Sequence, residues 1–170
     1  MIDVENSILQ ICVSFLFLIM HSVFAFFISI LMQPLLWFGI LDIPTLRASI
    51  LQTYHQHEGE KYLDRKSYAL EISEDGFIRY KRVWKNNKAE FFSVKIDKVK
   101  DLDYLGDEKA GWLILSCEPE TVIYQTRSDP SGNIDSMANE ISFPVSAISE
   151  TELNSFLNNF HSLKEIISER

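Results

Sequence analysis

Charged residues are absent from one long segment of this chain, and several chemically useful residue types are scarce elsewhere. No Asp, Glu, Lys or Arg occurs between Asn6 and Leu41, whereas every Lys and Arg and all but two of the acidic residues follow that segment. The two cysteines, Cys12 and Cys117, do not provide an intramolecular disulfide framework. No glycine-rich phosphate loop, nucleophile elbow or paired-carboxylate motif occurs, so the sequence disfavours an enzyme.

The charge-free segment predicts a membrane anchor. Residues 8–32 form a charge-free run with five polar interruptions, which is long enough for a spanning helix of roughly 20 apolar residues. The acidic N-terminus and the lack of an A-x-A site argue against a cleaved signal peptide. Pro34 should end or kink the helix, so residues 35–41 are expected to lie at the membrane interface. A two-helix hairpin is the alternative.

The distribution of basic residues predicts the orientation of the anchor. Basic residues flank it only on the C-terminal side, beginning with Arg47. By the positive-inside rule, the remaining chain should be cytoplasmic, with the protein integral to a bacterial inner (plasma) membrane. The predicted organisation is an anchor at 1–41, a connecting helix and linker at 42–66, and a soluble domain at 67–170.

The predicted soluble domain combines strands with a C-terminal helix. Residues 43–57 and a segment opened by the capping box Ser149-Glu-Thr-Glu152 have apolar residues at helical spacing. Residues 128–139 are expected to form a polar loop. Strands are expected at 68–72, 77–84, 90–96, 99–105, 112–117, 121–127 and 140–145. The predicted fold class is α+β: a transmembrane helix, then a seven-stranded antiparallel sheet or partly open barrel capped by the C-terminal amphipathic helix.

Two short segments add a family resemblance to this order of elements. Ile72-Ser-Glu-Asp-Gly-Phe-Ile78 opens the domain, and Ile141-Ser-Phe-Pro-Val145 runs into the capped helix. With the layout of residues 67–167, they resemble bacterial membrane-anchored proteins with a pleckstrin-homology-like (PH-like) domain, the YcxB-like and bacterial PH groups. The resemblance implies a PH-like fold and does not supply an activity.

The strongest candidate for a binding site is a basic cluster, because half of all Lys and Arg lie within residues 79–100. Basic side chains on such a hairpin would be attracted to anionic lipid head groups. Solvated strand faces, with lysines that guard strand edges, are the competing interpretation. The lipid- or partner-binding candidates are Arg79, Lys81, Arg82, Lys85 and Lys88.

Other polar residues give weaker signals. His55 and His57 lie two positions apart and do not share a helix face, while structural zinc sites usually need four spaced ligands. Cys117 lies within an apolar strand and is expected in the core. No catalytic residue, metal or cofactor is therefore predicted. The net charge of −8 disfavours a nucleic-acid partner.

The sequence therefore predicts a non-enzymatic, membrane-tethered binding or scaffold module. Its partners would be the lipid bilayer, through anionic head groups, or another protein. A small membrane-anchored immunity or stress protein is the alternative hypothesis. Residues 101–170 contain thirteen acidic and four basic side chains, and this excess would suit a basic toxin or partner.

Overall fold

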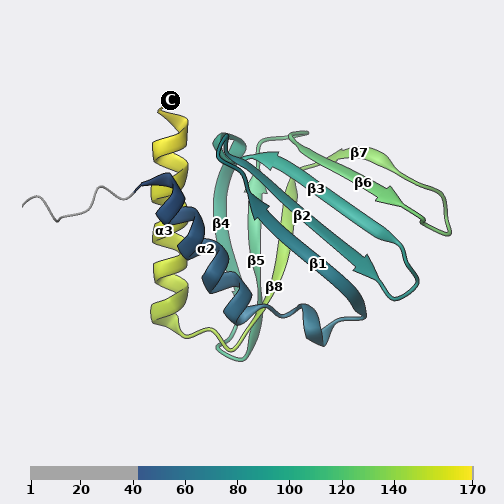
Figure 1. The fold of residues 1–170 in the computed structure, drawn as a ribbon, viewed down its shortest axis with the longest axis horizontal. Coiled ribbons are helices and arrows are strands. Elements are labelled where there is room, and N and C mark those ends of the chain that lie inside the picture. Colours follow the sequence, from purple (N-terminus) through teal and green to yellow (C-terminus); the bar gives the residue numbers. More distant parts are fainter. Residues whose placement is uncertain (1–41, 170) are drawn as a thin grey trace, which may run out of the picture. The chain divides into compact units, whose positions relative to one another are not determined.

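The computed structural model describes residues 42–169, which form two α-helices, eight strands and two short 3-10 turns (Figure 1). The helices are α2 (Ile43–His57) and α3 (Glu150–Ser168), and the turns are η2 (Glu60–Tyr62) and η3 (Ile96–Lys98). The strands are β1 (Arg65–Ile72), β2 (Phe77–Trp84), β3 (Ala89–Lys95), β4 (Val99–Gly106), β5 (Ala110–Cys117), β6 (Val122–Arg127), β7 (Asp135–Ala138) and β8 (Glu140–Ser146).

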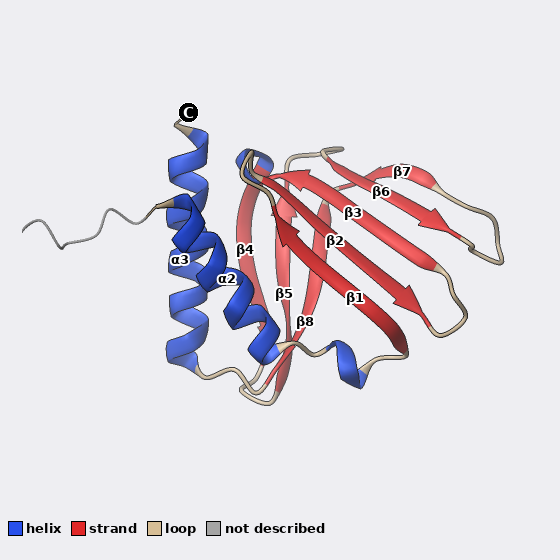
Figure 2. Cartoon of the chain, in the orientation of Figure 1, coloured by secondary structure: helices blue, strands red, loops and turns tan. Residues whose placement is uncertain are grey.

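The strands form two antiparallel sheets. One has five strands in the order β1-β2-β3-β6-β7, and the other has three in the order β4-β5-β8. The chain passes from one sheet to the other at η3, again between β5 and β6, and finally at Asn139, which separates β7 from β8. Figure 2 shows the helix pair beside the three-stranded sheet, while the five-stranded sheet extends away from the helices.

Both helices begin at side-chain caps that the local sequence supplies. The Asp42 carboxylate accepts a hydrogen bond from the Thr45 amide at 3.0 Å, and a proline occupies the first turn of α2. At α3, Ser149 and Glu152 form the predicted capping box: the Glu152 amide donates to the Ser149 hydroxyl, and the Ser149 amide donates to the Glu152 carboxylate. The two helices then pack against each other, and Asn159 donates to the Ser49 hydroxyl at 3.0 Å.

The hydrophobic core lies between this helix pair and the sheets. Each helix buries one apolar stripe, as helical periodicity requires. Cys117 is buried in β5, which confirms its predicted place in the core. Its burial raises the pKa of the thiol to about 11. The core includes Leu46, Ile50 and Tyr54 of α2, Phe156, Phe160 and Leu163 of α3, and Ile72, Ile78, Val94, Leu113, Leu115 and Phe143 of the strands.

The predicted seven-stranded sheet or partly open barrel is wrong. Within residues 42–169 there are eight strands in two open sheets, and two helices pack together where one capping helix was expected. The additional strand, β7, lies inside the predicted loop 128–139. This strand has four largely exposed residues and is held by its register with β6, so it lacks the alternating burial pattern by which strands are recognised in a sequence.

The prediction of an integral membrane protein, with an inner-membrane localisation, is also corrected. Among the helices of residues 42–169, none combines the length and the apolar character needed to cross a membrane. Even α3, the longest of them, exposes acidic residues on the side away from its buried stripe. The predicted span at 8–32 and the predicted interfacial stretch at 35–41 lie outside the described residues.

Candidate functional site

Two faces of the five-stranded sheet carry very different polar residues. Successive side chains of a strand point to opposite faces. On β2, Ile78 and Tyr80 are buried, and the Tyr80 ring lies 4.9 Å from the Phe143 ring of β8, centroid to centroid. We call this the inner face, and it also carries Arg82 further along β2. The outer face carries Arg79 and Lys81, which are exposed.

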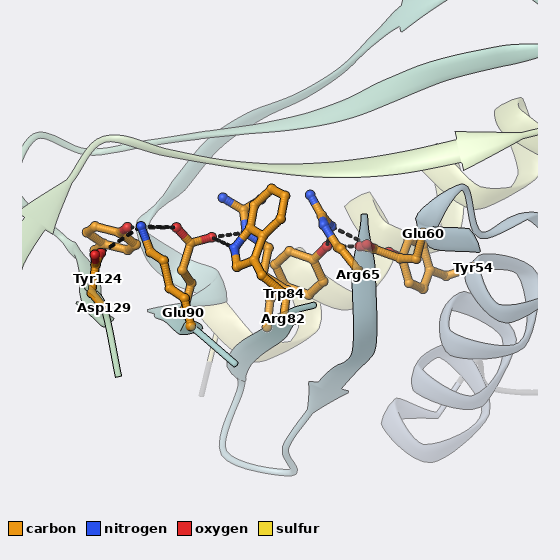
Figure 3. A network of polar contacts seen from close by, with 10 residues as sticks. Tyr54, Glu60, Arg65, Arg82, Trp84, Glu90, Tyr124 and Asp129 are labelled. Atoms are coloured by element: carbon orange, nitrogen blue, oxygen red, sulfur yellow. Dashed lines mark hydrogen bonds and ion pairs between the residues drawn. The ribbon is translucent and has the colours of Figure 1, made fainter. Parts of the chain in front are cut away.

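A buried charged cluster centred on Glu60 lies at one end of the inner face (Figure 3). The side chains of Glu60 and Arg65 are only 2% and 3% exposed and form an ion pair. The Tyr80 hydroxyl donates to the Glu60 carboxylate, and Arg65 Nη1 donates to the Tyr80 hydroxyl oxygen at 2.7 Å. The Arg65 guanidinium also lies 5.1 Å from the centre of the Trp84 ring. These contacts fix β1 and η2 to the inner face.

Burial controls the protonation of this cluster. Loss of solvation raises the pKa of Glu60, and the neighbouring Arg65 opposes that rise. Burial, with Glu60 nearby, likewise raises the pKa of Tyr54, whose hydroxyl donates to Glu60 at 3.4 Å. The Glu60 carboxylate thus has a partner in each of three side chains, as a buried charged group requires.

A second cluster on the inner face is centred on Glu90 of β3 (Figure 3). Arg82 pairs with this carboxylate, which also accepts from the Trp84 indole at 3.0 Å and the Tyr124 hydroxyl at 3.1 Å. Lys88 Nζ lies 3.3 Å from Glu90 Oε1 and 2.8 Å from Asp129 Oδ2. Burial of Glu90 opposes its ionisation, but these hydrogen bonds outweigh burial and hold the pKa of Glu90 below its usual value.

The outer face carries basic side chains that lie against aromatic rings. The Arg79 guanidinium is 5.3 Å from the centre of the Phe77 ring, and Lys81 Nζ is 5.4 Å from that of Phe91. Lys95 Nζ lies 5.7 Å from the centre of the same Phe77 ring. Such contacts hold a cation near a ring without neutralising it. A shallow depression between these side chains is lined by residues that include Arg79, Lys81, Phe91 and Gln125.

Exposed apolar residues continue the outer face toward β7. The strand register aligns Arg79, Ser93, Ile123 and Met137 in one row across β2, β3, β6 and β7. Ile123 is 41% exposed and Met137 is 51% exposed. The outer face therefore carries the basic Arg79 and Lys81 on β2, and the acidic Glu71 of β1 lies across from Arg79. On β6 and β7, the exposed apolar Ile123 and Met137 share this face with the hydrogen-bonded Gln125 and Asp135.

The five residues of the predicted binding cluster are divided between different surroundings. Arg79 and Lys81 lie together on the outer face, whereas Arg82 and Lys88 belong to the Glu90 cluster. Lys85 pairs with Asp64 at 2.5 Å, where both side chains are largely exposed. The binding role of these residues stays a prediction.

Sequence reasoning missed Glu60, Arg65 and Glu90. Glu60 and Arg65 lie in the segment interpreted as a charged linker, and nothing in its composition distinguishes buried charges from solvated ones. The Arg82–Glu90 pair had a partial signal, because the predicted hairpin of strands 77–84 and 90–96 brings these two residues near each other, and the register in the structure aligns them directly. The aromatic partner Phe91 could be found by the same register argument, because it lies across from Lys81, and Phe77 follows from alternation along β2, two positions before Arg79.

The remaining polar candidates have structural contacts. His57 Nε2 lies 3.2 Å from Glu152 Oε1 and so joins the end of α2 to the cap of α3. Within residues 42–169, no group of three or more His, Cys, Asp or Glu side chains is arranged to hold a metal ion.

Comparisons with protein-family models, with curated proteins and with solved structures find no match for this chain. The resemblance to the YcxB-like and bacterial PH groups therefore stays a prediction.

Proposed function

We propose that this protein is a non-enzymatic binding module whose outer face binds an acidic segment of another protein. The observation that supports this proposal is the excess of positive charge on that face. There, Arg79, Lys81 and Lys95 of β2 and β3 outnumber the one carboxylate of β1, Glu71, which lies across from Arg79. Within residues 42–169, neither Arg79 nor Lys81 forms an ion pair, although the inner-face cations Arg65, Arg82 and Lys88 all do. Unpaired cations held against rings are suited to receive carboxylates from a partner.

The apolar part of the outer face favours a protein segment over a simple anion. Ile123 and Met137 expose apolar surface on β6 and β7, and Phe91 of β3 lies between this region and the basic strand β2. An open face of an antiparallel sheet is ordinarily polar, and contiguous exposed apolar surface is typical of interaction sites. A segment with apolar residues beside Asp or Glu would match both halves of the face.

Selection from a random peptide library on the immobilised full-length chain tests this proposal. We expect the selected peptides to be enriched in Asp and Glu next to Leu, Ile or Phe. Fluorescence anisotropy should then give an affinity that falls with added salt, since exposed charges are screened. The double variant Arg79→Gln/Lys81→Gln should bind these peptides about tenfold more weakly, which corresponds to about 1.4 kcal/mol from two charged contacts.

A matched control is Lys61→Gln/Lys109→Gln, which removes the same charge from two exposed residues outside the five-stranded sheet. This variant should keep its affinity. The proposal would be overturned if the selected peptides were not enriched in Asp and Glu, or if both double variants lost affinity for them equally. Preferential binding of single-stranded oligonucleotides would also overturn it and would assign the basic and aromatic face to nucleic acid.

A further inference from the structure

Strand β4 leaves one backbone edge without a partner strand, because it is the outermost strand of its sheet and pairs only with β5. The Asp107 amide, just after β4, donates to the Ala110 carbonyl at 3.1 Å. In an antiparallel ladder, the backbone N–H and C=O groups of every second residue bond to the strand on one side, and those of the residues in between point to the other side. The backbone groups of Leu102, Tyr104 and Gly106 therefore point to the free edge.

Side chains occupy the beginning of this edge in place of a strand. Lys164 of α3 extends to the Lys100 carbonyl, with Nζ at 3.4 Å from the oxygen. The Leu102 amide donates to the carboxylate of its neighbour Asp101 at 2.9 Å. Lys100 lies at a break in the β4–β5 register. The Lys164 side chain is half-buried and the Asp101 side chain is exposed. The backbone of an incoming strand can therefore displace both from the edge.

A groove runs beside this edge, between β4 and α3, which are neighbours in Figure 1. Leu102, Leu157 and Phe160 supply apolar lining, and His161 and Lys164 lie at its polar side. On the opposite face of β4, the exposed side chains of Asp101 and Asp103 point away from the core. A strand added at this edge would therefore meet apolar groups on one face, and on the other the carboxylates of Asp101 and Asp103 followed by the exposed Leu105.

We propose that the free edge of β4 binds an extended segment of another protein in which apolar and basic residues alternate. The segment pairs its backbone with Leu102, Tyr104 and Gly106 and so adds a fourth strand to the sheet. Its apolar side chains enter the groove beside Leu157, and its basic side chains lie across from Asp101 and Asp103. Opposite charges across paired strands are stabilising.

The same carboxylates disfavour a second copy of this chain as the occupant. Antiparallel pairing of β4 with another β4 would bring Asp101 and Asp103 of both copies close together. Like charges directly opposite one another destabilise a pair of strands, and charged residues on edge strands prevent such self-association. A basic segment relieves this repulsion.

This inference does not depend on the outer face, since β4 belongs to the other sheet. Two surfaces of opposite preference, one for acidic and one for basic segments, would allow the module to hold two partners together.

A direct test titrates the full-length chain with the peptide acetyl-Lys-Val-Lys-Leu-Lys-Val-Lys-amide and follows backbone amides by NMR and hydrogen exchange. Binding should slow exchange of the Tyr104 and Gly106 amides. Asp101→Asn/Asp103→Asn should weaken binding about tenfold through the loss of two cross-strand pairs. Lys164→Met should strengthen binding, because the Lys100 carbonyl no longer has a competing donor.

The variant Glu108→Gln is the matched control, since it removes an exposed carboxylate from the turn beyond the end of β4, and it should keep the affinity. Arg79→Gln/Lys81→Gln should also keep it, which separates this site from the outer face. Binding without protection of the Tyr104 and Gly106 amides would overturn the proposal. So would equal binding of a peptide with Glu in place of Lys, or sedimentation that shows a dimer lost on peptide addition.

Discussion

The inner and outer faces of the five-stranded sheet are built by alternate residues of the same strands, yet they treat charge in opposite ways. Arg79 and Arg82 lie three positions apart on β2. Arg82 is half-buried and paired with Glu90, whereas Arg79 is exposed, lies against the Phe77 ring and forms no ion pair within residues 42–169. The inner charges are paired within the fold, and we propose that the outer cations contact a partner. The residue type alone therefore does not reveal which role a basic side chain has.

Among substitutions on the two faces, we expect the largest loss of stability at Glu60. The variant Glu60→Gln leaves the Arg65 guanidinium buried without a carboxylate, and loss of one member of a buried pair costs about 3 to 5 kcal/mol. Urea unfolding of the full-length chain should show this loss as a lower transition midpoint.

A double variant shows whether the lost stability comes from the buried charge that Glu60→Gln leaves unpaired. Replacing both members, as Glu60→Leu/Arg65→Met, should recover part of the lost stability, because a buried pair replaced by apolar residues is often neutral. A cost for Glu60→Gln below about 0.5 kcal/mol, the range of ordinary surface substitutions, would show that the Glu60 cluster does not stabilise the inner face.

A smaller, pH-dependent effect is expected at Glu90. Its pKa is lower in the folded protein than its usual value of 4.5, so ionised Glu90 stabilises the fold above that pH. This stabilisation is lost as the pH falls below 4.5 and toward the folded-state pKa. Glu90→Gln should cost about 1.5 to 3 kcal/mol at neutral pH, the range for hydrogen bonds to a charged group.

Unfolding curves of the wild type and Glu90→Gln measured between neutral and acidic pH check this expectation. Their free energies of unfolding should converge as the pH falls below 4.5. A difference that stays constant or widens toward acidic pH would contradict the assigned role of the Glu90 charge.

The smallest effect on stability is expected on the outer face. Arg79→Gln/Lys81→Gln removes two exposed cations that form no ion pair within residues 42–169, and should change the free energy of unfolding by less than about 0.5 kcal/mol. The same urea titration measures it. A loss as large as that of Glu90→Gln would mean that the outer cations also stabilise the fold.

Much of the local structure could be predicted from the sequence. The helix at Ile43–His57, the strand at Phe77–Trp84 and the capping box at Ser149 are confirmed. These elements have strong short-range signals, namely helical spacing, strict alternation and a four-residue cap. The strand β7 has none of these and depends on its pairing with β6.

The arrangement of strands and charges was less predictable, because it depends on contacts between distant residues. The division into two sheets follows from which strands pair, and β5 pairs with β8 rather than with β6, the strand that follows it in the chain. The burial of Glu60 depends on Tyr80, twenty positions away. The separation of Arg79 from Arg82, by contrast, follows from alternation alone.

The most direct test of separate roles for the two faces compares two variants, Arg79→Gln and Arg82→Gln. The affinity of each for a selected acidic peptide is measured under conditions where both variants are folded. We expect Arg79→Gln to bind several-fold more weakly with unchanged stability, since exposed charged contacts contribute about 0.2 to 1 kcal/mol each. Arg82→Gln should bind as the wild type does while unfolding at lower urea concentration. Equal affinity losses in the two variants, or a loss confined to Arg82→Gln, would contradict the assignment of binding to the outer face.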